Sequence, residues 1–367
     1  MQISAAVSRS PDQPPAIESL ELDEPRANEV VVRVLASGIC HTDLFAPLMY
    51  PLPAVLGHEG AGIVERVGSA VSKVAPGDRV VMTFGSCGSC ALCATGSPAY
   101  CEHGHHLQFS GVRDDGSKTL RKGGESIHGS FFQQSSFATY SLATERSVVK
   151  IAADIPIELA APLGCGIQTG AGAILNNLGV KAGARVVIFG AGSVGLAAVM
   201  AARLAGAGSI VAVDVNAARL ELARSLGATA VVDATVDIGS SDVVARLRAL
   251  TRGGATHSFE TAGQVASIAA AIECLRRKGV CAIATVPKMG EPYAQTLLPL
   301  LVGGKTLTGV LEGDSVPDQF IPQLVDWFLA GRLPLDRLIT NYQFTDIGRA
   351  LDDAHHGRVI KPVLRME

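Results

Sequence analysis

Short apolar runs, separated by glycine, proline and polar residues, fill the first part of the chain. Residues 29–35 (EVVVRVL), 61–68 (AGIVERVG) and 77–82 (GDRVVM) are runs of this kind, and each predicts a short strand. Between residues 85 and 130 the sequence is rich in Gly, Ser, Cys and His and shows no helical period. We therefore expect an irregular, β-rich first domain.

The pattern changes near residue 160. Residues 184–215 (ARVVIFGAGSVGLAAVMAARLAGAGSIVAVDV) read as strand, glycine turn, apolar helix and strand. Strand-like runs at 256–260 and 279–285 alternate with helical stretches at 241–251 and 264–277. Because strands that alternate with helices indicate parallel βαβ units, we expect a doubly wound α/β domain here. The last part of the chain is expected to return to the first domain.

A glycine turn, Gly190-Ala-Gly192-Ser-Val-Gly195, follows the strand-like run 185–189 and opens the apolar helix. Gly190 would permit the tight turn, Gly192 the close approach of a pyrophosphate, and Gly195 the packing of helix on sheet. Asp214 ends the next strand, where a carboxylate accepts hydrogen bonds from ribose hydroxyls and repels a 2′-phosphate. The motif predicts a dinucleotide site that favours NAD over NADP. A glycine turn in an unrelated α/β protein is the alternative.

Composition and charge limit the class of protein. The 367 residues carry a formal net charge of −3, and 48% of them are hydrophobic. No block rich in Lys and Arg is present, so neither a nucleic acid nor a membrane surface is an expected partner. The N-terminus has no secretory signal pattern, and the chain has no uninterrupted apolar run of about 18 residues. We therefore expect a cytoplasmic location.

Eight cysteines are present, and four of them fall within fifteen residues: Cys87, Cys90, Cys93 and Cys101. Four thiolates at these spacings on a loop fit a tetrahedral zinc shell. Because protein would fill all four positions, the predicted role is structural; unrelated free cysteines are the alternative. The neighbouring His103, His105 and His106 are interpreted as a solvated loop, and Cys281 as a core residue.

Three further candidate zinc ligands lie far apart in the sequence: Cys40 in GICHTD, His58 in GHEGAG and Cys165 in PLGCGIQTG. A catalytic zinc needs three protein ligands and one open position, and a Cys2His set is a known arrangement in an alcohol-oxidising site. The sequence does not show that the three converge, and each of them taken alone has a simpler structural interpretation.

Together these motifs resemble those of the zinc-dependent medium-chain alcohol dehydrogenases. GHEGAGIVERVGSAV is similar to the family's zinc signature, the cysteine cluster to its structural zinc lobe, and GAGSVG with Asp214 to its cofactor fold. The resemblance covers essentially the whole chain and implies an α/β protein with two domains. It implies a β-rich GroES-like catalytic domain over residues 1–166, with the zinc lobe at 85–105. A Rossmann NAD-binding domain would follow over 167–308, and residues 309–367 would return to the catalytic domain.

The resemblance also implies the ligands of the catalytic zinc, namely Cys40, His58 and Cys165. Asp43 would orient His58 through a hydrogen bond. Glu59 would be the carboxylate that can approach the metal when its ligands exchange.

The remaining implied roles concern the cofactor and the proton. Thr42 would touch the substrate oxygen and relay its proton, while His41 and Lys361 would contact the cofactor pyrophosphate. Thr169 and Val194 would flank the nicotinamide ring.

One position departs from the family pattern. Phe45 stands five residues after Cys40, where a histidine often ends the proton relay. An aromatic residue there would make the substrate pocket more apolar, and plain packing is the alternative. The stretches SFFQQSSFATYSL, APLGCGIQTGAGAILN and GGKTLTGVLEGDSVPDQFIPQLV most resemble the aryl-alcohol (benzyl alcohol) dehydrogenase branch. Relatives that act on allylic terpene alcohols such as geraniol carry similar segments.

The implied function is the reversible oxidation of an aromatic or allylic primary alcohol to its aldehyde, with NAD and two zinc ions per chain. Alternatives are an enzyme for geraniol-type or broad-range aliphatic primary alcohols. A zinc-free quinone or enoyl reductase, or a non-catalytic nucleotide-binding protein, would belong to a different class and should lack the candidate zinc ligands. The expected partners are a hydrophobic alcohol or aldehyde and further copies of the chain. Family relatives are dimers or tetramers that often pair their cofactor-domain sheets.

Overall fold

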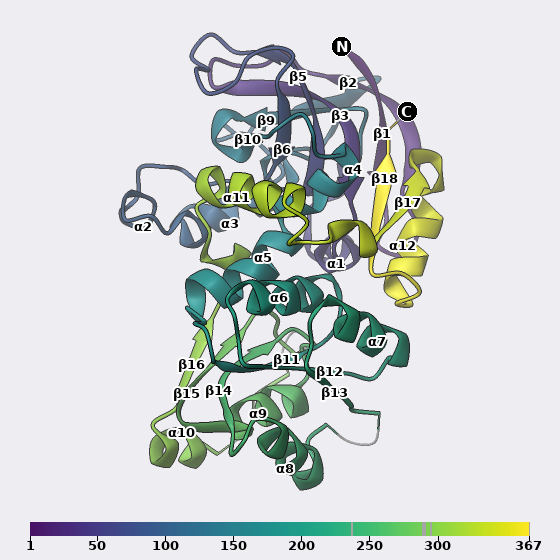
Figure 1. Cartoon of the computed structure of the whole chain (residues 1–367). Coiled ribbons are helices and arrows are strands. Elements are labelled where there is room, and N and C mark those ends of the chain that lie inside the picture. The colour runs from purple at the N-terminus through teal and green to yellow at the C-terminus, as the bar shows by residue number, and fades with distance from the viewer. Residues whose placement is uncertain (236–237, 288–290, 294–295, 367) are drawn as a thin grey trace. The chain divides into compact units, whose positions relative to one another are not determined.

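The computed structural model describes residues 1–235, 238–287, 291–293 and 296–366 (Figure 1). The chain forms two compact units, the first made of Met1–Gly166 with Val316–Glu367 and the second of Ile167–Ser315. The return to the first unit was expected at residue 309, but it comes at Val316. The reason is that β16 (Thr306–Gly309) is an edge strand of the second unit's sheet, and that Asn177 of the same unit holds Asp314 at 2.7 Å.

The first unit contains two β-sheets. One has the strand order β4-β1-β2-β7-β8, with β4 at Ala54–Val55, β1 at Gln2–Ser8, β2 at Ala16–Leu22, β7 at Leu120–Lys122 and β8 at Glu125–Ile127. The other has the order β10-β6-β5-β3-β18-β17, and β9 also pairs with β3. Its strands are β3 (Glu29–Gly38), β5 (Glu59–Val67), β6 (Arg79–Met82), β9 (Tyr140–Thr144), β10 (Val148–Lys150), β17 (Ile339–Gln343) and β18 (Lys361–Arg365).

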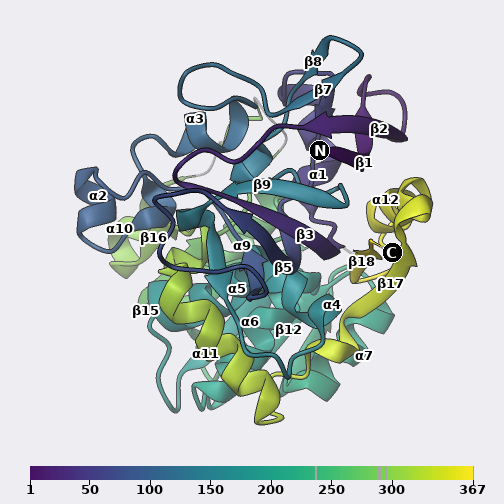
Figure 2. The same cartoon turned by 90° about the horizontal axis from the view of Figure 1, so that it is seen from above.

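Strand β3 organises this second sheet. It pairs antiparallel with β5, β9 and β18. Figure 2 labels these four strands in the view from above. Four valines of β3, Val30, Val31, Val32 and Val34, are buried in the core of the unit. A strand buried on both faces reads as a continuous apolar run, which is why residues 29–35 were predicted as a strand from sequence. The pairing with β18 attaches the C-terminal tail to the first unit.

Short helices of the first unit were not predicted. Helix α1 covers His41–Met49, and the stretch expected to be loop contains α2 (Ala91–Ala94) and α3 (Gly104–Phe109) besides the β7–β8 hairpin. Helix α1 was not predicted because Pro47 lies inside it, and proline normally breaks a helix. The other helices of this unit are α4 (Ile157–Ala160), α11 (Pro317–Leu329) and α12 (Ile347–His355).

The second unit is the predicted doubly wound domain. Its parallel sheet has the order β13-β12-β11-β14-β15-β16, with β11 at Arg185–Phe189, β12 at Ser209–Asp214, β13 at Ala230–Asp233, β14 at Ala255–Glu260 and β15 at Leu275–Ile283. Its helices are α5 (Gly166–Gly172), α6 (Ser193–Leu204), α7 (Ala217–Leu226), α8 (Ser241–Leu250), α9 (Val265–Glu273) and α10 (Leu298–Gly303). The prediction of alternating strands and helices is confirmed. Cys281 is fully buried in this core, as expected.

The described part of the chain contains no helix with the length and apolar character that crossing a bilayer requires.

Candidate functional site

Four side chains with metal-binding atoms meet in the first unit: Cys40, His58, Glu59 and Cys165. Their candidate ligand atoms all lie within 4.8 Å of one another. Cys40 precedes α1, His58 and Glu59 lie at the start of β5, and Cys165 follows the short 3-10 helix Ala161–Gly164. The structure thus brings together three segments whose convergence the sequence left open.

The imidazole of His58 is arranged as a metal ligand. Its Nδ1 lies 2.9 Å from Asp43 Oδ1, and both side chains are fully buried. Because a carboxylate only accepts hydrogen bonds, Nδ1 carries a ring proton, and in the neutral imidazole Nε2 is then the nitrogen with the free lone pair. Nε2 is buried and has no hydrogen-bond partner among the residues that the structure describes. A buried acceptor without a partner is costly, and a zinc ion held with Cys40 and Cys165 would satisfy it.

Asp43 holds two of these ligand-bearing residues at once. One carboxylate oxygen accepts the His58 ring proton, and the other accepts the backbone N–H of Cys40 at 2.8 Å. Asp43 is the third residue of α1, where a carboxylate commonly accepts a backbone N–H at the start of a helix. Asp43 therefore links the first turn of α1 to the orientation of the His58 ring.

Glu59 forms a buried ion pair with Lys361. Lys361 Nζ lies 2.8 and 2.9 Å from the two carboxylate oxygens and 3.0 Å from the carbonyl oxygen of Ile39. Burial raises the pKa of Glu59, and the ammonium of Lys361 opposes that rise. Gly38 leaves room for this pair, because a Cβ at residue 38 would overlap Glu59 Oε2.

The predicted contact of Lys361 with the cofactor pyrophosphate stays a prediction, and the structure shows a partner for Lys361 that the sequence did not indicate. The side chain is 2% exposed, and the three hydrogen-bonding partners of its ammonium are all inside the first unit. Strand β18 runs beside β3 and places Lys361 against Glu59, whose buried carboxylate needs a compensating charge.

Helix α1 carries three more residues with predicted roles. Thr42 Oγ1 lies 3.8 Å from Cys40 Sγ. The rings of His41 and Phe45 contact each other edge to face, with their centroids 4.8 Å apart. Phe45 is 43% exposed, so it does not fill the core. Its place in a substrate pocket, and that of His41 at the cofactor, stay predictions.

The four clustered cysteines also bring their sulfur atoms together, in a group separate from the first. Backbone N–H groups point at these sulfurs: Cys87 donates to Cys101 at 3.2 Å, and Cys90 donates to Cys87 at 3.3 Å. The N–H groups of Ser89 and Cys90 are the main reason that the pKa of Cys87 falls to about 5. A thiolate is the form that binds zinc, so these N–H groups favour the zinc-binding form of Cys87, and the four converging sulfurs fit a closed four-sulfur site.

The glycine turn of the second unit has the predicted geometry. Gly190 has a φ of +89°, and a Cβ at Gly195 would overlap the carbonyl oxygen of Gly190. Gly192 is different, because an added Cβ there would have no described protein atom within 4 Å. That open space fits the close approach of a ligand's pyrophosphate. Asp214 Oδ2 accepts the N–H of Ala191 at 2.6 Å and so holds the turn against the end of β12.

The predicted nicotinamide residues lie on adjoining segments of the second unit. Thr169 is in α5 and Val194 is in the first turn of α6. The two helices approach closely, since a Cβ at Gly170 would overlap the carbonyl oxygen of Val194. Contact of Thr169 and Val194 with a nicotinamide ring stays a prediction.

Sequence reasoning assigned no role to the aromatic residues that pack around His58. The Phe132 ring stacks on the imidazole with centroids 4.5 Å apart and an interplanar angle of 24°, and Phe131 contacts it edge on at 5.5 Å. Phe109 of α3 contacts both phenylalanines. The two adjacent phenylalanines are visible in the stretch SFFQQSSF. The local sequence pattern does not show that their rings pack against His58.

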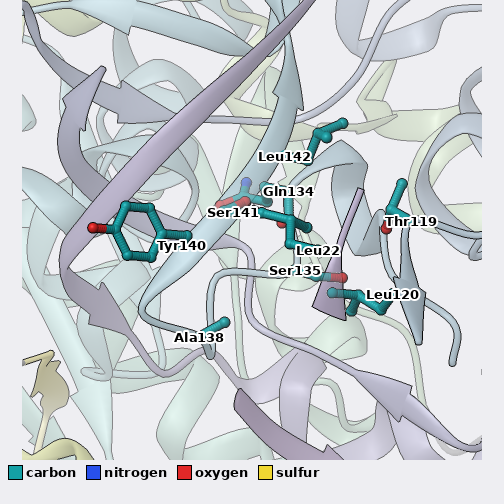
Figure 3. A pocket seen from close by; sticks show the side chains of 9 residues that line it. All are labelled: Leu22, Thr119, Leu120, Gln134, Ser135, Ala138, Tyr140, Ser141 and Leu142. Atoms are coloured by element: carbon teal, nitrogen blue, oxygen red, sulfur yellow. Dashed lines mark hydrogen bonds between the residues drawn. The ribbon is translucent and has the colours of Figure 1, made fainter. Parts of the chain in front are cut away.

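A small cavity lies among residues of β2, β7, β9 and the loop before β9 (Figure 3). The polar residues that line it are Thr119, Gln134, Ser135, Tyr140 and Ser141. It has room for about one water molecule, too little for a substrate. We assign no reaction to it.

Comparisons with known proteins identify the family. The family described as "Alcohol dehydrogenase GroES-like domain" matches residues 26–153, and "Zinc-binding dehydrogenase" matches residues 193–330. A geraniol dehydrogenase from Castellaniella defragrans is 45% identical over 363 residues, which are 98% of this chain and 96% of the relative.

Two solved structures are similar over the full length. An alcohol dehydrogenase zinc-binding domain protein from Burkholderia ambifaria has a TM-score of 0.97 and 47% identity, covering 100% of this chain and 99% of the other. The benzyl alcohol dehydrogenase from Acinetobacter calcoaceticus has a TM-score of 0.95 and 41% identity, covering 100% of both chains. With these similarities and the two cysteine clusters, the chain belongs to the NAD-dependent, zinc-dependent medium-chain alcohol dehydrogenases.

Proposed function

We propose that this enzyme catalyses the reversible oxidation of an aromatic or allylic primary alcohol to its aldehyde, with two zinc ions per chain. The observation that carries the proposal is the convergence of half-buried Cys40 with buried His58 and Cys165, in which His58 Nε2 lacks a protein partner among the described residues. A Cys2His set leaves one of the four zinc positions for a substrate oxygen. The four-cysteine loop is the proposed structural site.

When bound, zinc supplies a Lewis acid that makes the alcohol more acidic, and NAD supplies the acceptor for its hydride. The protein's residues do the rest. Asp43 orients His58, and Phe131 and Phe132 cover the imidazole and keep water from it. In the second unit, Gly192 leaves space for the pyrophosphate, and Asp214 is the proposed acceptor for the ribose hydroxyls.

Thr42 is the residue that we assign to the alcohol proton. Its hydroxyl is 3.8 Å from Cys40 Sγ, within reach of an oxygen bound beside that sulfur. Phe45 occupies the place of the histidine that often ends the relay, so Thr42 would pass the proton to a cofactor hydroxyl or to water.

The substrate class rests on the apolar surroundings of the site and on the relatives. Phe109, Phe131 and Phe132 form a connected aromatic cluster around His58. Two relatives are named geraniol dehydrogenase and benzyl alcohol dehydrogenase. Initial rates with NAD on benzyl, cinnamyl, geranyl and ethyl alcohols test the class. We expect the highest kcat/KM for an aryl or allylic alcohol, and ethanol as the best substrate would overturn the proposal.

We also propose that two copies of the chain associate through the edge of the second unit's sheet. Among the described residues, β16 is the last strand of that sheet, and an edge strand of this kind can pair with a strand of another chain. Beside it, α10 and the preceding residue expose four large apolar side chains: Leu297, Leu298, Leu301 and Val302. A second copy would extend the sheet and cover these residues, since a two-fold axis brings the same edge of both copies together.

Light scattering after gel filtration tests this association. We expect a dimer or a tetramer for the wild type and a smaller species for Leu301→Glu. Leu48→Glu is the matched control, because Leu48 is 67% exposed on α1 of the other unit. A monomeric wild type would overturn the proposal.

A further inference from the structure

Gln134 lies behind the candidate catalytic site and is 1% exposed. Its side-chain amide makes three hydrogen bonds to the backbone around the metal ligands. Nε2 donates to the carbonyl oxygen of His58 at 2.9 Å and to that of Thr83 at 3.3 Å, while Oε1 accepts the N–H of Gly60 at 3.1 Å. Gln134 therefore clamps the chain on both sides of Glu59, at the residues where β5 begins.

Thr83 extends this clamp to a second ligand. Its hydroxyl donates to the carbonyl oxygen of Gly164 at 2.7 Å, and Gly164 directly precedes Cys165. A Cβ at Gly164 would overlap the carbonyl oxygen of Met82, so the two segments are in close contact there. Through Gln134 and Thr83, the segment that carries His58 is joined to the segment that carries Cys165.

The loop that presents Gln134 is itself firmly held. Four non-glycine residues in it have positive φ values between 51° and 63°: Ser130, Phe132, Gln133 and Ser135. Backbone in this region is unfavourable for such residues and persists only when the surroundings hold it in place. Ser135 Oγ supplies part of this restraint, since it accepts the N–H of Phe131 at 2.9 Å and donates to the carbonyl oxygen of Val55 at 2.7 Å.

We infer that Gln134 is a positioning residue of the catalytic zinc site, and that it sets the spacing between His58 and Cys165 through the backbone carbonyls of His58 and Thr83. The inference rests on the proposed function, because it takes these two residues as ligands of one zinc ion. The side-chain hydrogen bonds of Gln134 go to backbone atoms of His58, Thr83 and Gly60, and not to the metal-binding atoms. Its effect is expected on metal retention and ligand geometry before any effect on chemistry.

The variant that tests this inference is Gln134→Met, with Gln133→Met as the matched control. Methionine is nearly isosteric with glutamine and removes all three hydrogen bonds. Alanine is avoided because Gln134 lines the cavity of Figure 3, and truncation would enlarge it. Gln133 is the neighbour in the same loop, but its side chain bonds to Thr144 at 3.0 Å instead of to a ligand segment.

The measurement is the rate at which each zinc ion is lost to a chelator, followed by a colorimetric indicator. We expect loss from the catalytic site to become about 10- to 100-fold faster in Gln134→Met, the range found for residues that orient metal ligands. Loss from the cysteine loop should keep its wild-type rate, as should both rates in Gln133→Met. Cobalt in the catalytic site adds a spectroscopic signature, since its visible absorption band should shift in Gln134→Met only.

Thr83→Val keeps the test decisive if Gln134→Met does not fold. It removes the hydroxyl that donates to Gly164 and keeps the Thr83 carbonyl that Gln134 contacts, so we expect a smaller acceleration at the catalytic site, and Thr83→Ser should restore the wild-type rate. Wild-type rates and spectra in the folded variants would overturn the inference, as would equal acceleration at both zinc sites. A wild-type protein with zinc only in the cysteine loop would instead overturn the proposed function, and the inference with it.

Discussion

The two cysteine-containing clusters of this enzyme differ in how their ligands are brought together. In the cysteine loop, all four sulfurs come from residues 87–101 and are approached by backbone N–H groups of the same loop. In the other cluster the ligands come from three distant segments, and side chains of Asp43, Gln134 and Thr83 hold them. In a local site, the main-chain N–H groups of one loop can support the ligands. In a site assembled from distant segments, buried side chains that are not themselves ligands hold the ligands in place.

The largest effect is expected when a ligand of the assembled cluster is lost. His58→Ala removes the imidazole that Asp43 orients and should lower kcat/KM by at least about a thousandfold, or ~4 kcal/mol. Because the cysteine loop is separate, its zinc should remain. Steady-state kinetics with circular dichroism as the folding check measures this. Activity near the wild-type level in a folded variant would contradict the assignment of the catalytic role to the cluster that contains His58.

Loss of a ligand from the cysteine loop should lower the stability of the protein and leave its activity nearly unchanged. Cys90→Ser opens a closed four-sulfur shell, and structural zinc contributes directly to folding free energy. We expect a clear fall in the melting temperature, with kcat of the folded protein within about threefold of the wild type. An unchanged melting temperature would show that the loop has no structural role.

At the assembled cluster of Cys40, His58 and Cys165, we expect a residue that only orients a ligand to affect how tightly zinc is held. Asp43→Asn weakens the acceptor that holds the His58 ring and the Cys40 N–H. We expect catalytic zinc to be held about 10- to 100-fold more weakly, while the cysteine loop is unaffected. Competition with a chelator of known affinity measures both sites in one experiment, and equal weakening of both would contradict this account.

The smallest effect is expected when a side chain beside a ligand of the cysteine loop is removed, and Ser89→Ala is that change. Ser89 Oγ is 3.7 Å from Cys87 Sγ, but it is the Ser89 backbone N–H, at 3.4 Å, that supports this sulfur most. Ser89→Ala keeps that N–H, so the rate of zinc loss should change less than about twofold. A large acceleration would show that side chains support this site too.

The same difference explains how much could be predicted from sequence. The cysteine loop was recognisable because its four ligands share one short stretch, and the glycine turn because strand, turn and helix are consecutive. Cys40, His58 and Cys165 were recognisable only as separate candidates. Their convergence depends on the pairing of β3 with β5 and on the contact of Thr83 with Gly164, neither of which has a local sequence signal.

Two residues show where sequence reasoning stops. The ion pair between Lys361 and Glu59, which lies 302 residues earlier in the chain, was not predicted. Gln134 was not singled out, because its side chain bonds to backbone groups 51 to 76 residues away and no spacing reveals such bonds. Both are buried polar groups satisfied by distant parts of the first unit, and only a folded structure shows what satisfies them.

The zinc content per chain tests the central claim most directly. Elemental analysis of the wild type, His58→Ala and Cys90→Ser, purified side by side, distinguishes one zinc site from two. We predict two zinc ions in the wild type and one in His58→Ala, with the remaining ion on the cysteine loop, and one in Cys90→Ser, with the remaining ion on the assembled cluster. A wild type with a single zinc ion, or a His58→Ala variant that keeps two, would contradict the account.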